Sequence, residues 1–214
     1  RSINKNKIEK KVDFYDKSKE VISFLKKENL ITDTHTDIFS AIKNADLIII
    51  ATPLSAYKEI LFSIKDKLKN NVILTDTGSA KKEVNKIIEE LNLNSFTWIA
   101  SHPIAGTEDS GPQAGFAEIF NDRWCIISPS KNAKNDDIEK INNFWKKIGS
   151  RTKIMSFEEH DHILSLTSHL PHAIAYNLVR STINNDDKFK KDIIRYSAGG
   201  LRDFTRIAAS DPVM

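Results

Sequence analysis

Three short apolar runs alternate with amphipathic segments in the first half of the chain, and their order restricts the fold severely. The runs lie at 47–51 (LIIIA), 71–75 (NVILT) and 96–100 (FTWIA), and the segments 57–68 and 81–91 carry apolar residues at helical spacing. A continuous apolar run is typical of a parallel strand buried on both faces, and strands that alternate with helices favour a doubly wound sheet. We therefore predict an α/β fold with a mostly parallel sheet.

The first predicted strand runs from Val12 to an acid, Asp16. The second strand of a dinucleotide-binding fold carries such an acid, which binds the ribose hydroxyls and favours NAD over NADP. The alternative for Asp16 is an ordinary helix N-cap, a role for which Ser18 competes. The chain has no Gly-x-Gly-x-x-Gly motif. We expect that loop and its central strand to lie upstream of Arg1 in a longer protein.

Near residue 155 the pattern changes from mixed α/β to helical. Residues 157–183 show no strand signal, and Pro171 should kink or break the helix predicted there. The other elements predicted beyond residue 100 are helices at 114–120, 136–148 and 201–209, strands at 124–128 and 151–155, and a loop at 197–200. We predict a dinucleotide-binding domain over 1–155 and an all-helical domain over 156–214, each incomplete at its outer end.

A histidine follows the last of the three apolar runs. His102 is followed by a loop of small residues, 105–107. A histidine in such a loop faces a cleft easily, because ligands of open α/β sheets collect at the carboxyl ends of the strands. Its imidazole is the side chain best matched to proton transfer near neutral pH. The alternative is a histidine that hydrogen-bonds a loop carbonyl.

Small hydroxyl residues follow the other two apolar runs. Thr52 and Pro53 come after the first, and Ser79 comes after the second. Such residues line a cofactor cleft or cap the next helix, and capping is the favoured alternative for Ser79 because a helix is predicted from residue 81. We read Lys81 and Lys82 as part of a solvated helix face, not as a nucleic-acid patch.

Four histidines lie between residues 160 and 172, and we do not expect them to bind a metal. His169 and His172 are three residues apart and project from nearby helix faces. His160 and His162 add no zinc-binding spacing. We expect a kinked helix to present either His169 or His172 to a cleft, with the other one packed against the protein or capping a helix.

Two arginines follow the glycine pair at 199–200. Arg202 and Arg206 are four residues apart and share a helix face. Arginine is suited to bidentate binding of a carboxylate, and the glycines would let a loop approach a ligand closely. Salt bridges with Asp203 or other acids are the alternative.

Composition limits the remaining classes. The 214 residues carry a net charge of +3 in mixed Lys, Glu and Asp patterns, which gives no reason to expect a nucleic-acid partner. The chain has no run of 18 apolar residues, so we expect no membrane span. One cysteine, Cys125, excludes an internal disulfide and favours a reducing, cytoplasmic location. Its strand-like surroundings indicate a buried thiol instead of a nucleophile.

Taken together, the motifs resemble those of the prephenate and arogenate dehydrogenases of tyrosine biosynthesis, most closely the bacterial cyclohexadienyl type. They are spread over most of the chain. The matching stretches are TDTGSAK at 75–81, SHPIAGTEDSGPQAGFAEIF at 101–120, RWCIISP at 123–129, TSHLPHAIAYNLV at 167–179 and SAGGLRDFTRIAASDPVM at 197–214.

The resemblance implies a Rossmann-like first domain and an NAD-dependent oxidative decarboxylation of prephenate to 4-hydroxyphenylpyruvate, of arogenate to tyrosine, or of both. A hydride leaves the hydroxyl-bearing ring carbon, the carboxylate departs as CO2, and the ring becomes aromatic. The resemblance also implies a cytoplasmic homodimer when full length. Met214 falls before the family's remaining helices.

The resemblance also assigns roles to single residues. His102 would accept the hydrogen bond of the ring hydroxyl and must be neutral, so the rate should fall on acidification. Ser79 would orient His102 and the hydroxyl, and Arg206 would hold a substrate carboxylate. His172 and Thr107 would line the same pocket. The residues on the cofactor side would be Asp16, Thr52 and Pro53.

Two other readings stay open. The first is a non-catalytic remnant or regulatory module that keeps the fold without turnover. The second is another two-domain dehydrogenase, such as a β-hydroxyacid type, which normally uses a catalytic lysine. No glycine-flanked lysine stands in the helical part to fill that role.

Overall fold

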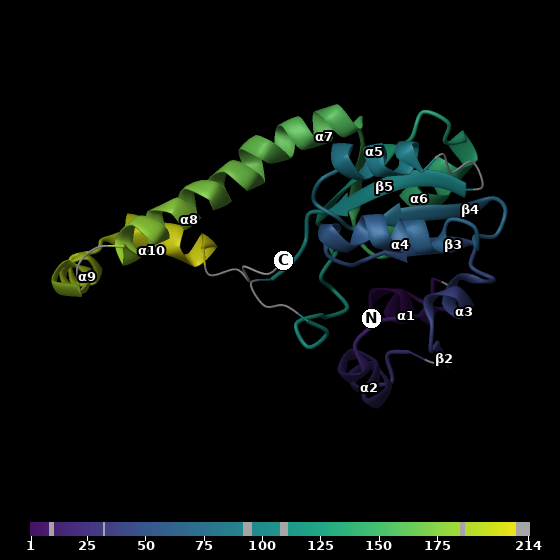
Figure 1. Cartoon of the computed structure of the whole chain (residues 1–214), viewed down its shortest axis with the longest axis horizontal. Coiled ribbons are helices and arrows are strands. Elements are labelled where there is room, and N and C mark those ends of the chain that lie inside the picture. Colours follow the sequence, from purple (N-terminus) through teal and green to yellow (C-terminus); the bar gives the residue numbers. More distant parts are fainter. Residues whose placement is uncertain (9–10, 32, 92–95, 108–110, 185–186, 209–214) are drawn as a thin grey trace. The chain divides into compact units, whose positions relative to one another are not determined.

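The computed structural model describes residues 1–8, 11–31, 33–91, 96–107, 111–184 and 187–208. The chain forms two compact units, Arg1–His160 and Asp161–Met214. Figure 1 shows the first as a sheet with helices and the second as helices alone. The predicted fold class, a mostly parallel Rossmann-like sheet followed by a helical part, is thereby confirmed.

The first unit contains two sheets. A small parallel sheet pairs β1 (Asp13–Phe14) with β2 (Asp33–Thr34). The larger sheet has the order β3-β4-β5-β6-β7, with β6 antiparallel to β5 and every other neighbouring pair parallel. Its strands are β3 (Leu47–Ile50), β4 (Val72–Asp76), β5 (Phe96–Pro103), β6 (Trp124–Pro129) and β7 (Arg151–Ile154).

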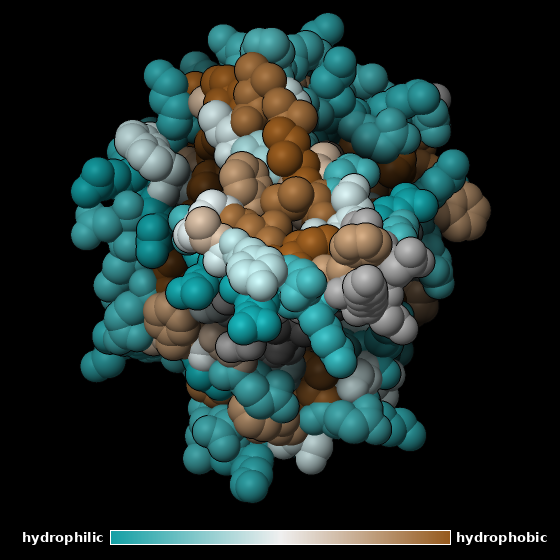
Figure 2. All heavy atoms as spheres, turned by 90° about the vertical axis from the view of Figure 1, so that its left-hand side faces the viewer, coloured by the Kyte–Doolittle hydropathy of each residue, from teal (hydrophilic) through white to brown (hydrophobic). Residues whose placement is uncertain are grey.

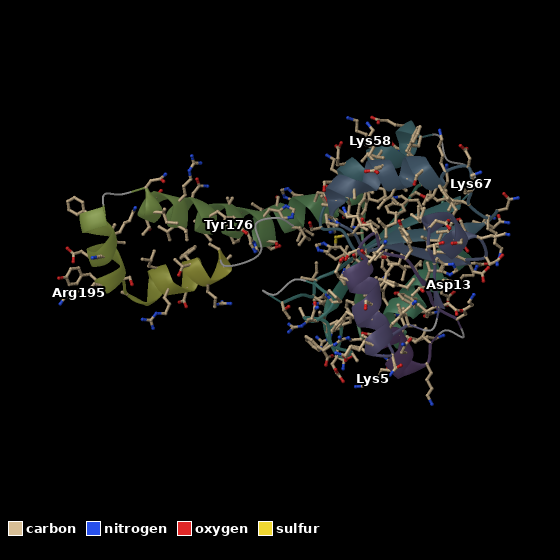
Figure 3. All side chains as sticks on the ribbon, turned by 60° about the horizontal axis from the view of Figure 1, so that its bottom comes forward. Lys5, Asp13, Lys58, Lys67, Tyr176 and Arg195 are labelled. Atoms are coloured by element: carbon tan, nitrogen blue, oxygen red, sulfur yellow. The ribbon has the colours of Figure 1, made fainter. Side chains whose placement is uncertain are left out.

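Helices cover both faces of the larger sheet (Figure 1). The helices of the first unit are α1 (Ser2–Asn6), α2 (Lys19–Lys27), α3 (Ile38–Ile42), α4 (Tyr57–Ile64), α5 (Lys82–Glu90) and α6 (Asn135–Lys147), with a 3-10 turn at Leu54–Ala56. Successive strand residues face opposite sides, so Leu74 packs with α4 and α5 whereas Ile73 packs with α6. Figure 3 shows side chains filling the space between sheet and helices.

The helical part begins with α7 (Phe157–Leu164), continues through a π-helical turn at Ser165–His169, and proceeds to α8 (Leu170–Ile183). α9 (Asp187–Arg195) and α10 (Gly199–Ile207) follow, and α10 packs against α8. Pro171 stands in the first turn of α8, directly after the π-helical turn. A proline lacks the N–H that a continuous α-helix needs at that point. The predicted break in the α-helix near Pro171 is found as this π-helical turn.

Three predicted details are wrong. β5 continues to Pro103, so His102 lies in the strand and not in the loop after it, because β6 extends the ladder by pairing Ile126 with His102. The predicted helix at 114–120 consists of turns. Gly199 and Gly200 form the first turn of α10 instead of a loop, and a Cβ at either position would meet nothing within 4 Å.

Within the described part of the chain, none of the helices has the length and apolar character needed to span a membrane. Glu108, Asp109 and the last residues of the 197–214 motif lie outside the described residues.

Candidate active site

A buried ion pair joins the carboxyl ends of β4 and β5. Lys81 Nζ donates to both carboxylate oxygens of Asp76, at 2.8 and 2.7 Å, and to the carbonyl oxygen of Ser101 at 2.6 Å. Both charged side chains are completely buried. The prediction that Lys81 belongs to a solvated helix face is therefore wrong: it is the N-cap residue of α5, and its side chain turns inward to the last residue of β4.

Asp76 accepts three further hydrogen bonds. The donors are the Ser101 N–H at 2.9 Å, the Gly78 N–H at 3.1 Å and the Tyr57 hydroxyl at 3.3 Å. Burial and the charge of Asp76 raise the pKa of Tyr57, which keeps the hydroxyl protonated as a donor. A Cβ at Gly78 would lie 2.7 Å from Leu54 Cδ2 and 2.9 Å from the Tyr57 hydroxyl, so a side chain there would crowd one of the donors to Asp76. The carboxylate is thus enclosed by donors, as a buried charge requires.

The side chain of Ser101 is held as firmly as its backbone. Its Oγ lies 2.8 Å from Thr75 Oγ1 and accepts from Trp145 Nε1 at 3.0 Å. All three residues are buried. The residue that precedes His102 is therefore fixed from β4, α5 and α6 at once, which fixes where His102 leaves the strand.

His102 contacts a second imidazole. Its Nδ1 lies 2.8 Å from His160 Nε2, and the two ring planes are tilted by 57°. His160 is completely buried, whereas His102 is partly exposed. The sequence reading considered His160 only as a zinc ligand and missed this pairing. His102 and His160 are 58 residues apart, so no local sequence pattern predicts the contact between their rings.

The small residues predicted to line a cofactor cleft lie at the same edge of the sheet. Thr52 and Pro53 are exposed two and three residues after β3, and Ser79 is exposed after β4. The N-cap of α5 is Lys81 and not Ser79, so the capping role considered for Ser79 is wrong. Thr107 is exposed beyond the end of β5. Since β3, β4 and β5 are parallel neighbours, their carboxyl ends bring these segments to one edge.

Asp16 lies two residues beyond β1, which is shorter than the predicted strand. Its Oδ1 accepts the Ser18 N–H at 2.8 Å, and Ser18, not Asp16, caps α2 by accepting from Val21 N at 3.2 Å. The competing capping role for Asp16 is therefore filled by its neighbour. A partly exposed carboxylate at the end of this strand fits the hydroxyls of a ribose.

The other candidates belong to the second unit. His172 is partly buried on α8, where its Nδ1 lies 2.8 Å from the Ser168 carbonyl oxygen and its ring 6.5 Å from that of Tyr176, the residue labelled in Figure 3. Arg206 and Arg202 are exposed on α10. A common pocket for these residues and His102 stays a prediction.

Two smaller predictions concern cysteine and metals. Cys125 is completely buried with a free thiol, so the prediction of a buried thiol is confirmed. Burial also raises the pKa of that thiol, which disfavours the reactive thiolate. Among the described residues, no group of three or more His, Cys, Asp or Glu side chains is arranged to hold a metal ion.

Comparison with protein families identifies both parts of the chain. Residues 1–154 match the family described as prephenate dehydrogenase, nucleotide-binding domain, and residues 156–214 match prephenate dehydrogenase, dimerization domain. The cyclohexadienyl dehydrogenase of Zymomonas mobilis is 43% identical over 94% of this chain and 68% of its own length. The prephenate dehydrogenase of Bacillus subtilis is 31% identical over the whole chain, which spans 57% of that protein.

Solved structures agree with these matches. Prephenate dehydrogenase from Aquifex aeolicus, in complex with hydroxyphenyl propionate and NAD+, superimposes with a TM-score of 0.88 at 29% identity. The match covers 99% of this chain and 73% of that one. Arogenate dehydrogenase from Synechocystis, with a TM-score of 0.77 and 20% identity, supports the fold alone.

Proposed function

The chain belongs to the prephenate dehydrogenase family, and we propose that it carries out the NAD-dependent oxidative decarboxylation of prephenate to 4-hydroxyphenylpyruvate. Arogenate is proposed as a second substrate, because a relative is named cyclohexadienyl dehydrogenase. The observation that carries the proposal is His102, which stands at the carboxyl edge of the sheet with its Nδ1 held by a buried imidazole. The other ring nitrogen, Nε2, is then the one that meets the substrate.

The cofactor side of the proposal rests on residues of the first unit. Asp16 would hold the ribose hydroxyls through the carboxylate that follows β1, and Thr52 and Pro53 would line the cleft after β3. NAD, when bound, supplies the acceptor for the hydride. The negative charge of Asp16 would repel the 2′-phosphate of NADP, so we expect NAD to be the preferred cofactor.

The proton chemistry falls to His102. Its neutral imidazole accepts the hydrogen bond of the ring hydroxyl and takes the proton as the C–O bond becomes a carbonyl. Ser79, at the end of the neighbouring strand, orients the hydroxyl and the imidazole. Loss of the ring carboxylate as CO2 makes the ring aromatic, which drives the reaction. The main task of the protein is therefore to orient the substrate and to polarise its ring hydroxyl.

Three further residues are proposed to bind the substrate. Arg206 would bind a substrate carboxylate through its planar guanidinium, and His172 and Thr107 would line the pocket. In the homodimer that we also propose, the helical part would form the contact between subunits, as the match to a dimerization domain supports.

The proposal is tested by replacing His102 in the gene product that contains this sequence. His102→Asn should lower kcat for NADH formation from prephenate by about 10²- to 10⁴-fold, the usual contribution of a positioned acid or base. The dissociation constant of NAD, measured by fluorescence titration, should stay unchanged. The matched control is His162→Asn on α7, which replaces an exposed histidine and should leave kcat as in the wild type.

Two results would contradict the proposal. Unchanged turnover in His102→Asn would remove the histidine from the mechanism. Tight NAD binding without turnover of prephenate or arogenate by the wild-type protein would favour the non-catalytic reading.

A further inference from the structure

His160 faces His102 through the contact between their imidazole rings. It stands on the first turns of α7, where its backbone N–H donates to the Ser156 carbonyl oxygen at 3.0 Å. Its side chain is completely buried, and its Nε2 lies 2.8 Å from His102 Nδ1. We propose that His160 is a positioning residue that fixes the tautomer and the orientation of His102. This inference rests on the proposed function of His102.

The tautomer follows from the contact between two ring nitrogens. A hydrogen bond between them requires a proton on one and a lone pair on the other. His102 can accept the hydroxyl proton at Nε2 only if its own proton sits on Nδ1. That N–H then donates to the lone pair of His160 Nε2, and His160 carries its proton on Nδ1. The opposite arrangement would give His102 an N–H at Nε2, which is a donor and not a base.

The same contact sets the orientation of the ring. The backbone of His102 is fixed by pairing with Ile126 of β6 and by the neighbouring Ser101, which Lys81 and Asp76 hold. These contacts leave the side-chain torsions of His102 undetermined. The ring centroids lie 5.1 Å apart at an interplanar angle of 57°, so the rings meet through their edges and not by stacking. His160 therefore selects one ring rotation out of those that the backbone allows.

His160 also acts when the proton moves. In the step proposed above, the O–H bond of the substrate breaks and an N–H bond forms at His102 Nε2, which leaves a positive charge on the imidazole. The Nδ1–H···Nε2 hydrogen bond to His160 then becomes charge-assisted, and such bonds are shorter and stronger than neutral ones. The buried imidazole thus stabilises the protonated form of His102 without taking the proton itself.

Two variants separate this role from packing. His160→Phe keeps an aromatic ring of similar size but offers no lone pair, whereas the side-chain amide oxygen of His160→Gln can accept from His102 Nδ1–H. We expect His160→Phe to lower kcat by about 10- to 100-fold, by analogy with the loss of a hydrogen-bond partner that orients a metal-bound histidine. The KM for prephenate should stay within about threefold. His160→Gln should recover at least about a tenth of the wild-type kcat.

A spectroscopic measurement tests the proposal without turnover. Long-range ¹H–¹⁵N NMR of histidine-labelled protein distinguishes the two neutral tautomers, and the His102→Asn variant assigns the signals. We expect the Nδ1–H form of His102 in the wild type and a loss of that preference in His160→Phe. An Nε2–H form in the wild type would overturn the proposal, as would a wild-type kcat in folded His160→Phe. If the wild type forms no NADH, the proposed function fails. The tautomer of His102, compared between the wild type and His160→Phe, then still tests whether His160 orients it.

Discussion

The role proposed for Arg206 belongs to a single side chain. It is exposed on α10, and Arg202 is exposed one turn earlier. If the guanidinium of Arg206 binds the substrate carboxylate, Arg206→Ala should raise the KM for prephenate by about tenfold or more, because a hydrogen bond to a charged group contributes about 1.5–3 kcal/mol. The NAD dissociation constant should not change. Arg202→Ala is the matched control, and steady-state kinetics with both variants decide which arginine faces the substrate.

The proposed role of Asp16 in choosing the cofactor also belongs to a single side chain. Its carboxylate lies beyond the end of β1 and is not used as the cap of α2. Asp16→Asn should lower kcat/KM for NAD by about tenfold, since one charged acceptor is lost, and should raise the ratio of NADP to NAD use. Asp66→Asn changes an exposed acid that follows α4 and is the control. An unchanged cofactor ratio in Asp16→Asn would exclude Asp16 from the ribose site.

The side chains that the sequence singled out and those that it left misjudged differ in one physical respect. His102 and Ser79 were proposed as site residues because strand-end positions bring side chains to one edge of a parallel sheet. Lys81 and His160 were missed because their partners lie in other elements, at Asp76 and His102. A lysine at the start of a predicted amphipathic helix gives the same local pattern whether it faces water or a buried carboxylate. Only the tertiary contact distinguishes the two.

At the scale of elements, Lys81 ties α5 to β4 and β5. Lys81→Met removes the cation and leaves the Asp76 carboxylate buried without it, so we expect a loss of about 3–5 kcal/mol in the free energy of unfolding. Lys86→Met, an exposed lysine on the same helix, should change stability by less than about 0.5 kcal/mol. Urea denaturation followed by circular dichroism measures both. Equal midpoints for the two variants would show that the ion pair does not stabilise the fold.

Helices and strands were predicted correctly where the hydrophobic periodicity of the sequence is strong. They were missed where pairing with a distant strand determines the structure. β3, β4 and α6 were recognised from apolar runs and helical spacing. The last residues of β5 have no apolar pattern and became strand only because β6 pairs with them in antiparallel order. The predicted helix at 114–120 had helical composition, but the chain forms turns there. Local propensity is overridden in both cases by what surrounds the segment.

At the scale of the whole molecule, the predicted site residues are divided between the two units. His102, Ser79, Thr52 and Asp16 belong to the first unit, whereas His172 and Arg206 belong to the second. The first four were singled out at or just after predicted strand ends, and the last two on predicted helices. The expected kinetic effects of His102→Asn and Arg206→Ala together test whether both sets act on one substrate.

The last prediction concerns dimer formation through the helical part of the chain. Ile163, Leu166, Leu170 and Ile174 recur every three or four residues along α7, the π-helical turn and α8, and their exposed fractions range from 43% to 57%. Apolar side chains also gather in a band on the face that Figure 2 presents. Exposed apolar stripes of this kind mark protein–protein contacts, and residues 156–214 match a dimerization domain.

We expect a dimer in which this stripe is buried. Leu170→Glu would place a charge in an apolar contact that cannot pair with it, so the dimer should dissociate at micromolar concentration in sedimentation-velocity or light-scattering measurements. Phe62→Glu is the matched control, because Phe62 is 61% exposed on α4 of the first unit and its replacement adds the same charge elsewhere. A monomeric wild-type protein would contradict the homodimer. A dimer that withstands Leu170→Glu but not Phe62→Glu would move the contact from the helical stripe to the first unit.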